Sequence, residues 1–176
     1  MSGNYFNKYR ISSSRLKFWN YSQNGYYFVT ICSKNQKKYF GEISNSEIIL
    51  SDLGKLAQKY WKAIPQHYPF VNLDVFIIMP NHIHGIIIID KNVETQNFAS
   101  LQHSEGNKFG PQSQNLGAII RGFKAAVKKY AVINNIPFSW QPRFYDRIIR
   151  NERELFNIRK YIVYNPYKWE DDEYYL

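Results

Sequence analysis

The stretch LDVFIIMPNHIHGIIII, residues 73–89, decides the expected fold. Two runs within it, residues 73–79 and 82–89, are rich in β-branched and aromatic residues and have the composition of strands. Pro80 and Asn81 separate the runs, and their turn chemistry favours an antiparallel hairpin. We therefore predict that the two runs form the central strands of an antiparallel sheet.

The rest of the chain offers further strands and three amphipathic helices around this hairpin. The expected strands cover residues 26–33, 37–43, 47–50 and 143–150, with turn-like segments that suggest a meander among the first three. The expected helices, with apolar residues at helical spacing, run over residues 51–64, 116–134 and 151–164. Asn151 precedes Glu154 by three residues, close to a capping box, and Pro166 is expected to stop the last helix.

The order of these elements predicts an α+β fold, with an antiparallel sheet covered by helices rather than a parallel βαβ array. The chain has 176 residues, no internal repeat and no linker, so we expect one domain over residues 1–176 with its core at about 26–169. Residues 91–115 are mostly polar and longer than a normal connection, and they predict a flexible loop.

The positive charge of the chain is grouped along the sequence. The formal net charge is +9. Residues 1–41 hold seven Lys or Arg and no acid, residues 42–120 are nearly neutral, and residues 121–169 hold eleven Lys or Arg against three acids. The last stretch, residues 170–173, is acidic. Grouped cations interleaved with Tyr and Trp favour a nucleic-acid partner. The alternative is that the basic residues are ordinary solvated surface and the aromatic residues belong to the core.

Cysteine usage and hydropathy bear on the compartment. Cys32 is the single cysteine, which excludes an internal disulfide framework and favours a reducing environment. No apolar stretch reaches the length of a bilayer helix, and residues 1–10 lack a hydrophobic signal region. We therefore expect a soluble cytoplasmic protein without membrane association.

His82 and His84 are the best candidates for chemistry. Side chains two apart in a strand point to the same face, so the two imidazoles form half of a metal site on a rigid strand. A pair of hydrogen-bonded core histidines is the alternative, and no third His, Cys or carboxylate lies nearby in the sequence. On the last helix, Tyr161 and Asn165 are four apart and share a face at the edge of its apolar stripe.

The segments MPNHIHGIII, FKAAVKKY and WQPRFYDRIIRNERELFNIRKYIVYNPYKW resemble the single-tyrosine HUH transposases, most closely their REP-associated branch. The resemblance covers about residues 26–169. It implies a ferredoxin-like antiparallel sheet, helices packed on one face, and the His pair on a central strand. Residue by residue, it implies that His82 and His84 bind a metal and that Tyr161 is the nucleophile. Asn165 matches a third ligand that is often Gln in relatives.

The resemblance also implies a reaction. Tyr161 is expected to attack a phosphodiester of single-stranded DNA that carries a hairpin, with Mg²⁺ or Mn²⁺ as cofactor, and to form a 5′-phosphotyrosine. Judged by ligand type alone, two histidine ligands also suit zinc. The candidates for phosphate contacts are basic residues of the second helix and the following strand: Arg121, Lys124, Lys128, Arg143, Arg147 and Arg150.

Two other functions compete with a transposase that cleaves and joins DNA. One is a non-catalytic binder of single-stranded DNA or RNA hairpins on the same fold, in which Tyr161 only packs. The other is a zinc hydrolase that uses His82 and His84 without any tyrosine. Both a monomer and a homodimer are compatible with the sequence.

Overall fold

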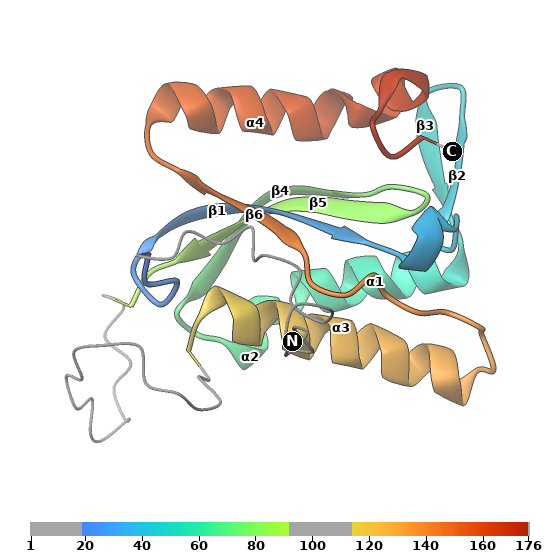
Figure 1. Ribbon diagram of the computed structural model, residues 1–176, viewed down its shortest axis with the longest axis horizontal. Coiled ribbons are helices and arrows are strands. Elements are labelled where there is room, and N and C mark those ends of the chain that lie inside the picture. The colour runs from blue at the N-terminus through green and yellow to red at the C-terminus, as the bar shows by residue number, and fades with distance from the viewer. Residues whose placement is uncertain (1–18, 92–113, 176) are drawn as a thin grey trace, which may run out of the picture.

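The computed structural model describes residues 19–91 and 114–175 (Figure 1). Its helices and strands, in chain order, are β1 (Gly25–Cys32), β2 (Gly41–Ser44), β3 (Glu47–Leu50), α1 (Asp52–Lys62), α2 (Ile64–His67), β4 (Val71–Ile78), β5 (His82–Ile89), α3 (Leu116–Ile133), β6 (Tyr145–Ile149) and α4 (Glu152–Tyr164). Two 3-10 helices, η2 (Lys34–Gln36) and η3 (Asn165–Asp171), complete them. Most of the expected loop at 91–115 lies outside the described residues.

The main sheet has four strands in the order β4-β5-β1-β6, and every neighbouring pair is antiparallel. With α1 and α3 as the connections, this is the ferredoxin-like arrangement of a split βαβ fold. The α+β prediction is confirmed, and so is the central position of the strand that carries the two histidines. None of the helices in the described ranges has the length and apolarity needed to cross a membrane.

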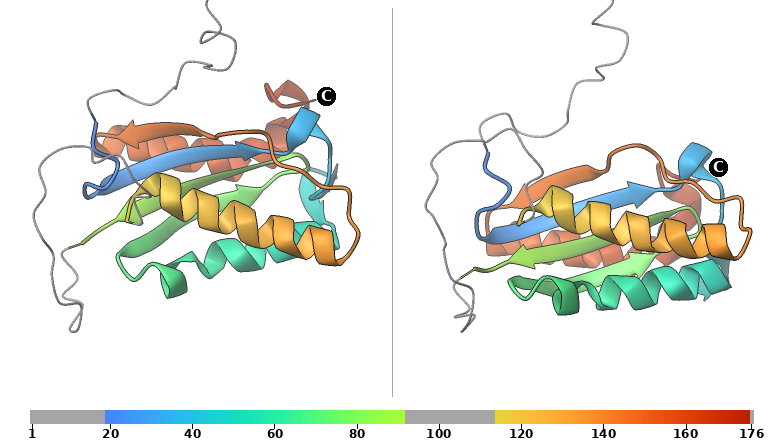
Figure 2. Two further views of the ribbon diagram at one scale, coloured as in Figure 1. Left: turned by 60° about the horizontal axis from the view of Figure 1, so that its bottom comes forward. Right: turned by 90° about the horizontal axis from the view of Figure 1, so that it is seen from below.

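The helices cover both faces of this sheet. Helices α1 and α3 lie side by side on one face, as the resemblance implied, while α4 lies alone on the other (Figures 1 and 2). The physical reason is that β1 and β5 carry apolar side chains on both faces: Val29 and Ile87 belong to the core under α1 and α3, and Phe28 and Ile86 to the core under α4. The apolar side chains on the second face are therefore also buried, by α4.

The expected meander of the first three strands is wrong. Strands β2 and β3 pair with each other in a separate two-stranded sheet, and neither pairs with β1 among the described residues. After β1 the chain turns through η2, where Asn35 and Gln36 have positive φ angles of 56° and 51°. The backbone N–H of Lys34 donates to Ser139 instead of to a β2 residue, which directs the chain away from the main sheet.

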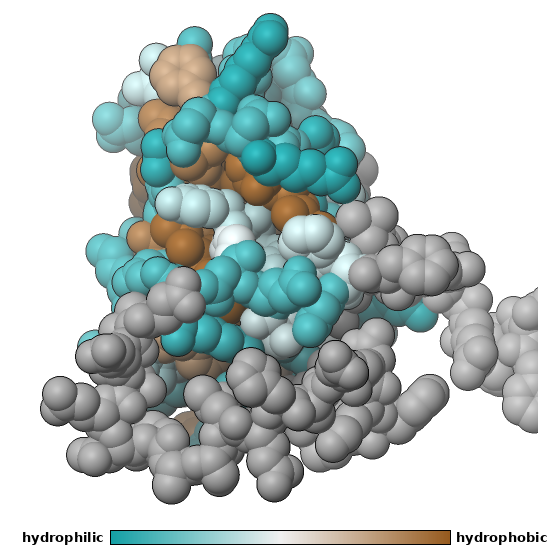
Figure 3. All heavy atoms as spheres, turned by 90° about the vertical axis from the view of Figure 1, so that its left-hand side faces the viewer, coloured by the Kyte–Doolittle hydropathy of each residue, from teal (hydrophilic) through white to brown (hydrophobic). Residues whose placement is uncertain are grey.

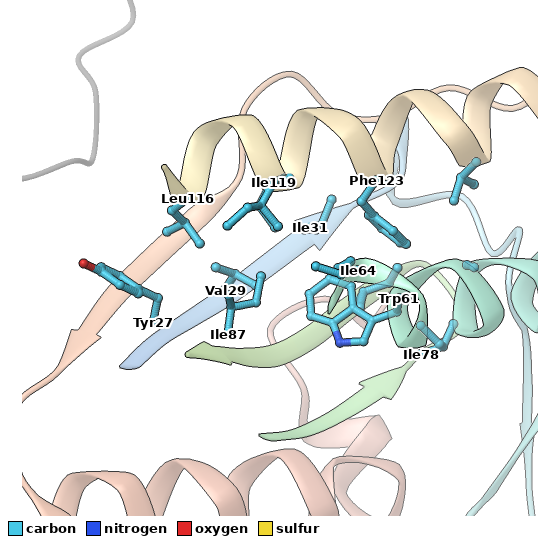
Figure 4. Close-up of a cluster of buried hydrophobic side chains, with 14 of the residues drawn as sticks. Tyr27, Val29, Ile31, Trp61, Ile64, Ile78, Ile87, Leu116, Ile119 and Phe123 are labelled. Atoms are coloured by element: carbon cyan, nitrogen blue, oxygen red, sulfur yellow. The ribbon is translucent and has the colours of Figure 1, made fainter. Parts of the chain in front are cut away.

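The larger core fills the space between the sheet and the helix pair α1 and α3 (Figure 4). Trp61 of α1 is fully buried at its centre and packs edge-to-face against Phe123 of α3, with ring centroids 5.2 Å apart. The indole reaches the sheet because Gly85 of β5 has no side chain there. A Cβ at Gly85 would lie 2.4 Å from the Trp61 ring.

The smaller core fixes α4 on the sheet. Leu155 and Ile162 of α4 pack on Phe28 and Ile86 of the two central strands. The helix begins as predicted at its cap Asn151, whose side-chain oxygen accepts from the Glu154 backbone N–H at 2.8 Å. It ends at Tyr164 and continues directly into η3.

We expect Gly85→Ala to lower the free energy of unfolding by about 1–3 kcal/mol, because the new methyl group must displace a buried indole. Chemical denaturation followed by circular dichroism measures the loss. In a Trp61→Phe background the smaller ring leaves room, so the same change should cost at least about 1 kcal/mol less. An equal cost in both backgrounds would contradict the assigned contact.

Candidate functional site

His82 and His84 of β5 lie on the face of the sheet covered by α4. Their exposed fractions are 0% and 1%, and their ring centroids are 4.4 Å apart. Burial lowers the pKa of His82 well below its ordinary value, helped by neighbouring His84, and lowers the pKa of His84 to about 3. Both rings are therefore neutral at physiological pH, the form in which imidazole nitrogens bind metals.

Each imidazole is held at Nδ1. His82 Nδ1 is 2.8 Å from the Asn81 side-chain oxygen, and His84 Nδ1 is 2.9 Å from the Thr30 hydroxyl of β1. His82 Nε2 is buried and has no hydrogen-bond partner among the described residues. A buried nitrogen without a partner is costly unless a ligand completes it, so this atom points to a bound group.

Tyr161 of α4 places its hydroxyl against this pair, 3.1 Å from His84 Nε2. Its side chain is 41% exposed and its ring lies edge-on to Phe28, with centroids 6.1 Å apart. Burial of the hydroxyl raises the pKa of Tyr161 above its ordinary value, and the carboxylates of Asp172 and Glu173 add to this. Forming a phenolate here requires a nearby positive charge.

Asn165 and Asp172 approach the histidines from η3 and the residue that follows it. Asn165 is 3% exposed; its side-chain N–H donates to Asp172 Oδ2 at 2.7 Å, while its Oδ1 is buried without a partner. Asp172 Oδ1 accepts from the backbone N–H of Tyr174 at 2.7 Å. These hydrogen bonds fix both side chains beside the histidine pair.

The ligand atoms of His82, His84 and Asp172 all lie within 4.8 Å of one another. Two neutral imidazoles and a carboxylate are a donor set that divalent metals accept. The side-chain oxygen of Asn165, which is hydrogen-bonded through its amide to Asp172, has no partner among the described residues. The residues present therefore fit a divalent ion. The sequence analysis missed Asp172; the signal was an acidic run directly after the Tyr161 helix in an otherwise basic chain.

Polar contacts at two points hold α4 in the position that brings Tyr161 to the histidines. Arg159 pairs with Asp74 of β4, with 2.5 Å between Nη2 and Oδ2. Near the start of the helix, Glu154 accepts from the Arg147 side chain of β6 at 2.6 Å and from the Arg150 backbone N–H at 2.9 Å. The helix is thus tied to both edge strands of the sheet.

Two adjoining hollows flank Tyr161. The first, about 990 Å³, contains His84, Asp172 and Lys160 in its lining. The second, about 850 Å³, is lined by Tyr161 and by three arginines, Arg147, Arg150 and Arg153. It lies near the start of α4, the end of the molecule shown in Figure 3, where a band of hydrophobic side chains separates hydrophilic ones.

The structure separates the basic residues that the sequence analysis grouped together. Arg147 and Arg150 lie beside Tyr161, whereas Arg121, Lys124 and Lys128 belong to α3 on the opposite face of the sheet.

The ammonium groups of Lys124 and Lys128 are already engaged. Lys124 donates to the carbonyls of Gln141 and Arg143 at 2.7 and 2.8 Å, and Lys128 donates to that of Phe138. DNA contact by the six residues stays a prediction.

Comparison with known proteins adds two relatives in sequence and one solved structure of similar fold, although no family model matches the chain. An uncharacterized protein of Haemophilus influenzae is 43% identical over 168 residues, which cover 93% of this chain and 92% of the relative. A second protein of this organism, provisionally named a REP-associated tyrosine transposase, is 28% identical over 84% of this chain and 73% of its own length. The solved structure of a REP-associated tyrosine transposase bound to a REP hairpin matches 90% of this chain and 74% of its own, with a TM-score of 0.60 and 19% identity.

The fold is that of the solved REP-associated tyrosine transposase, and the histidine pair facing a helical tyrosine agrees with the resemblance to the single-tyrosine HUH transposases. The chain belongs to one family with its 43% identical H. influenzae relative, and it is similar to the REP-associated tyrosine transposases.

Removing the charge of Asp172 tests the metal site. We expect Asp172→Asn to weaken Mn²⁺ binding about 10-fold or more, because the ion loses its anionic ligand. Isothermal titration calorimetry measures the affinity. Glu170→Gln is the matched control: it removes the same charge from the same acidic run at an exposed position. Equal losses in both variants would show a general charge effect instead of ligation.

Proposed function

We propose that this protein cleaves and rejoins single-stranded DNA at hairpins, with Tyr161 as nucleophile and a divalent metal held by His82, His84 and Asp172. Asn165 is the fourth donor. The observation that carries the proposal is the 3.1 Å contact between the Tyr161 hydroxyl and His84 Nε2, which brings a nucleophile to the metal-binding group. The relative whose solved structure contains a REP hairpin supports the hairpin substrate.

The proposed reaction exchanges one phosphodiester for another. The Tyr161 oxygen attacks phosphorus and loses its proton, a bond forms between that oxygen and phosphorus, and the bond from phosphorus to the 3′ oxygen breaks. The products are a 5′-phosphotyrosine and a strand with a free 3′-hydroxyl, which takes up a proton. A 3′-hydroxyl that attacks the phosphotyrosine reverses the step, so strand joining needs no nucleoside triphosphate.

The chain's own residues prepare this reaction. Neutral His82 and His84 offer lone pairs, and the hydrogen bonds to Asn81 and Thr30 orient their rings. A divalent cation such as Mg²⁺ or Mn²⁺ at this site supplies positive charge that polarises the phosphodiester and favours ionisation of the nearby phenol. Without that charge, the burial and the acidic neighbours of Tyr161 oppose ionisation.

The second hollow, near the start of α4, suits a single DNA strand. Arg150 and Arg153 supply positive charge for phosphates, and Arg147 lines the same hollow while its side chain is paired with Glu154. Tyr145 supplies an aromatic face on which a base can stack. We further propose that residues 1–176 act as a single domain in which recognition and chemistry share the same sheet and helices. We propose that Tyr161 acts with the histidine pair that it contacts at 3.1 Å, in a monomer or in a homodimer.

Tyr161→Phe is the direct test of the nucleophile. Incubated with a single-stranded hairpin DNA and Mn²⁺ or Mg²⁺, the unmutated protein should form a covalent adduct that survives denaturing electrophoresis. The variant should form none, since the phenyl ring has no oxygen to attack with. Tyr167→Phe, an exposed tyrosine in η3 away from both hollows, should form the adduct normally.

The same assay separates the competing functions. Hairpin binding with no adduct from the unmutated protein would identify a non-catalytic binder, with the preference for DNA or RNA read from the same titration. Cleavage that persists in Tyr161→Phe would identify a hydrolase that uses the histidine pair alone.

Salt dependence tests the proposed path of the strand. We expect Arg150→Ala to reduce the slope of log affinity against log salt by about 0.7 to 0.9, the release expected for one phosphate contact. Fluorescence anisotropy with a labelled hairpin measures the slope. Lys62→Ala is the charge-matched control and should leave the slope unchanged, because Lys62 is exposed at the end of α1, a helix on the opposite face of the sheet (Figure 1). A slope unaffected by Arg150→Ala contradicts the assigned path.

A further inference from the structure

Asn81, in the turn between β4 and β5, is fully buried and uses its whole side chain in hydrogen bonds. Its amide N–H groups donate to the carbonyls of Gln36 at 3.1 Å and Tyr174 at 2.7 Å. Its oxygen lies 2.8 Å from His82 Nδ1. The amide has only this orientation available, because a flipped amide would set its oxygen against two carbonyl oxygens.

This orientation decides where His82 carries its proton. A carbonyl oxygen only accepts hydrogen bonds, so His82 Nδ1 must be the protonated nitrogen and Nε2 must hold the lone pair. That Nε2 is the buried atom without a partner among the described residues. His84 differs, since the Thr30 hydroxyl at its Nδ1 both donates and accepts and so imposes no tautomer.

We propose that Asn81 is a positioning residue of the metal site, which fixes the tautomer and the ring orientation of His82 before any metal binds. The inference rests on the proposed metal-dependent function and adds a residue to it. A ring with its proton on Nε2 cannot bind a metal through that atom. The carbonyls of Gln36 in η2 and of Tyr174 after η3 thus hold the Asn81 amide in place, and the amide in turn orients the His82 ring.

The first test needs no variant of Asn81 and neither metal nor DNA. Long-range ¹H–¹⁵N correlation spectra of the metal-free protein separate protonated from unprotonated ring nitrogens, and His82→Gln identifies the signals of His82. We expect Nδ1 protonated and Nε2 unprotonated. A His82 proton on Nε2 would overturn the proposal even if the DNA-cleavage assay succeeds, and the expected tautomer would stand even if that assay fails.

The second test removes the amide. Asn81→Ala should produce a population with the proton on His82 Nε2 and weaken Mn²⁺ binding about 10- to 100-fold in calorimetry. Ser33→Ala is the matched control: Ser33 is buried, its backbone N–H donates to the Asn81 carbonyl, and its hydroxyl donates to the Lys37 carbonyl instead of to the His82 ring. The control should lose stability but keep tautomer and affinity. An unchanged tautomer and affinity in Asn81→Ala, or the same change in Ser33→Ala, would falsify the assignment.

Discussion

Side chains of β5 alternate between two faces of the sheet that are covered by different helices. Ile83 and Ile87 enter the core under α1 and α3, and Gly85 admits the Trp61 ring on that same face. His82 and His84 point the other way: the His84 ring lies against Tyr161 of α4, and the His82 ring lies beside that of His84. Because β5 is a central strand paired on both sides, its register is held by β4 and β1, and the two imidazoles inherit that rigidity. A slip by one residue would bury the histidines in the larger core.

The chemistry of the site follows from burial on the α4 face. Water is excluded from the two rings, so their pKa values fall and both imidazoles stay neutral. The same exclusion raises the pKa of the neighbouring Tyr161 hydroxyl. The protein thus presents two neutral imidazoles beside a phenol whose ionisation is opposed, and the divalent cation of the proposed function would find ligands in the first and favour ionisation of the second.

Acidic and basic side chains lie on different sides of Tyr161, although the formal net charge of the chain is +9. The residues after η3 bring acidic groups to the metal-binding side, where Asp172 is hydrogen-bonded to Asn165. The arginines of β6 and of the start of α4 line the adjoining hollow. In the proposed function the acidic groups bind the cation and the basic groups bind the DNA backbone, and Tyr161 lies between the two sets.

The sequence by itself determined the hairpin of the two central strands, the α+β class, the cap at Asn151 and the shared face of His82 and His84, because strand alternation and capping are local rules. It did not determine the placement of β2 and β3, which depends on the turn after β1. Only the tertiary structure brought Asp172 to the histidines and moved α3 with Lys124 and Lys128 to the opposite face. The partners of Asn81 likewise lie 45 and 93 residues away in the chain. Such long-range contacts leave no periodic pattern in the sequence, since they arise from how whole elements pack.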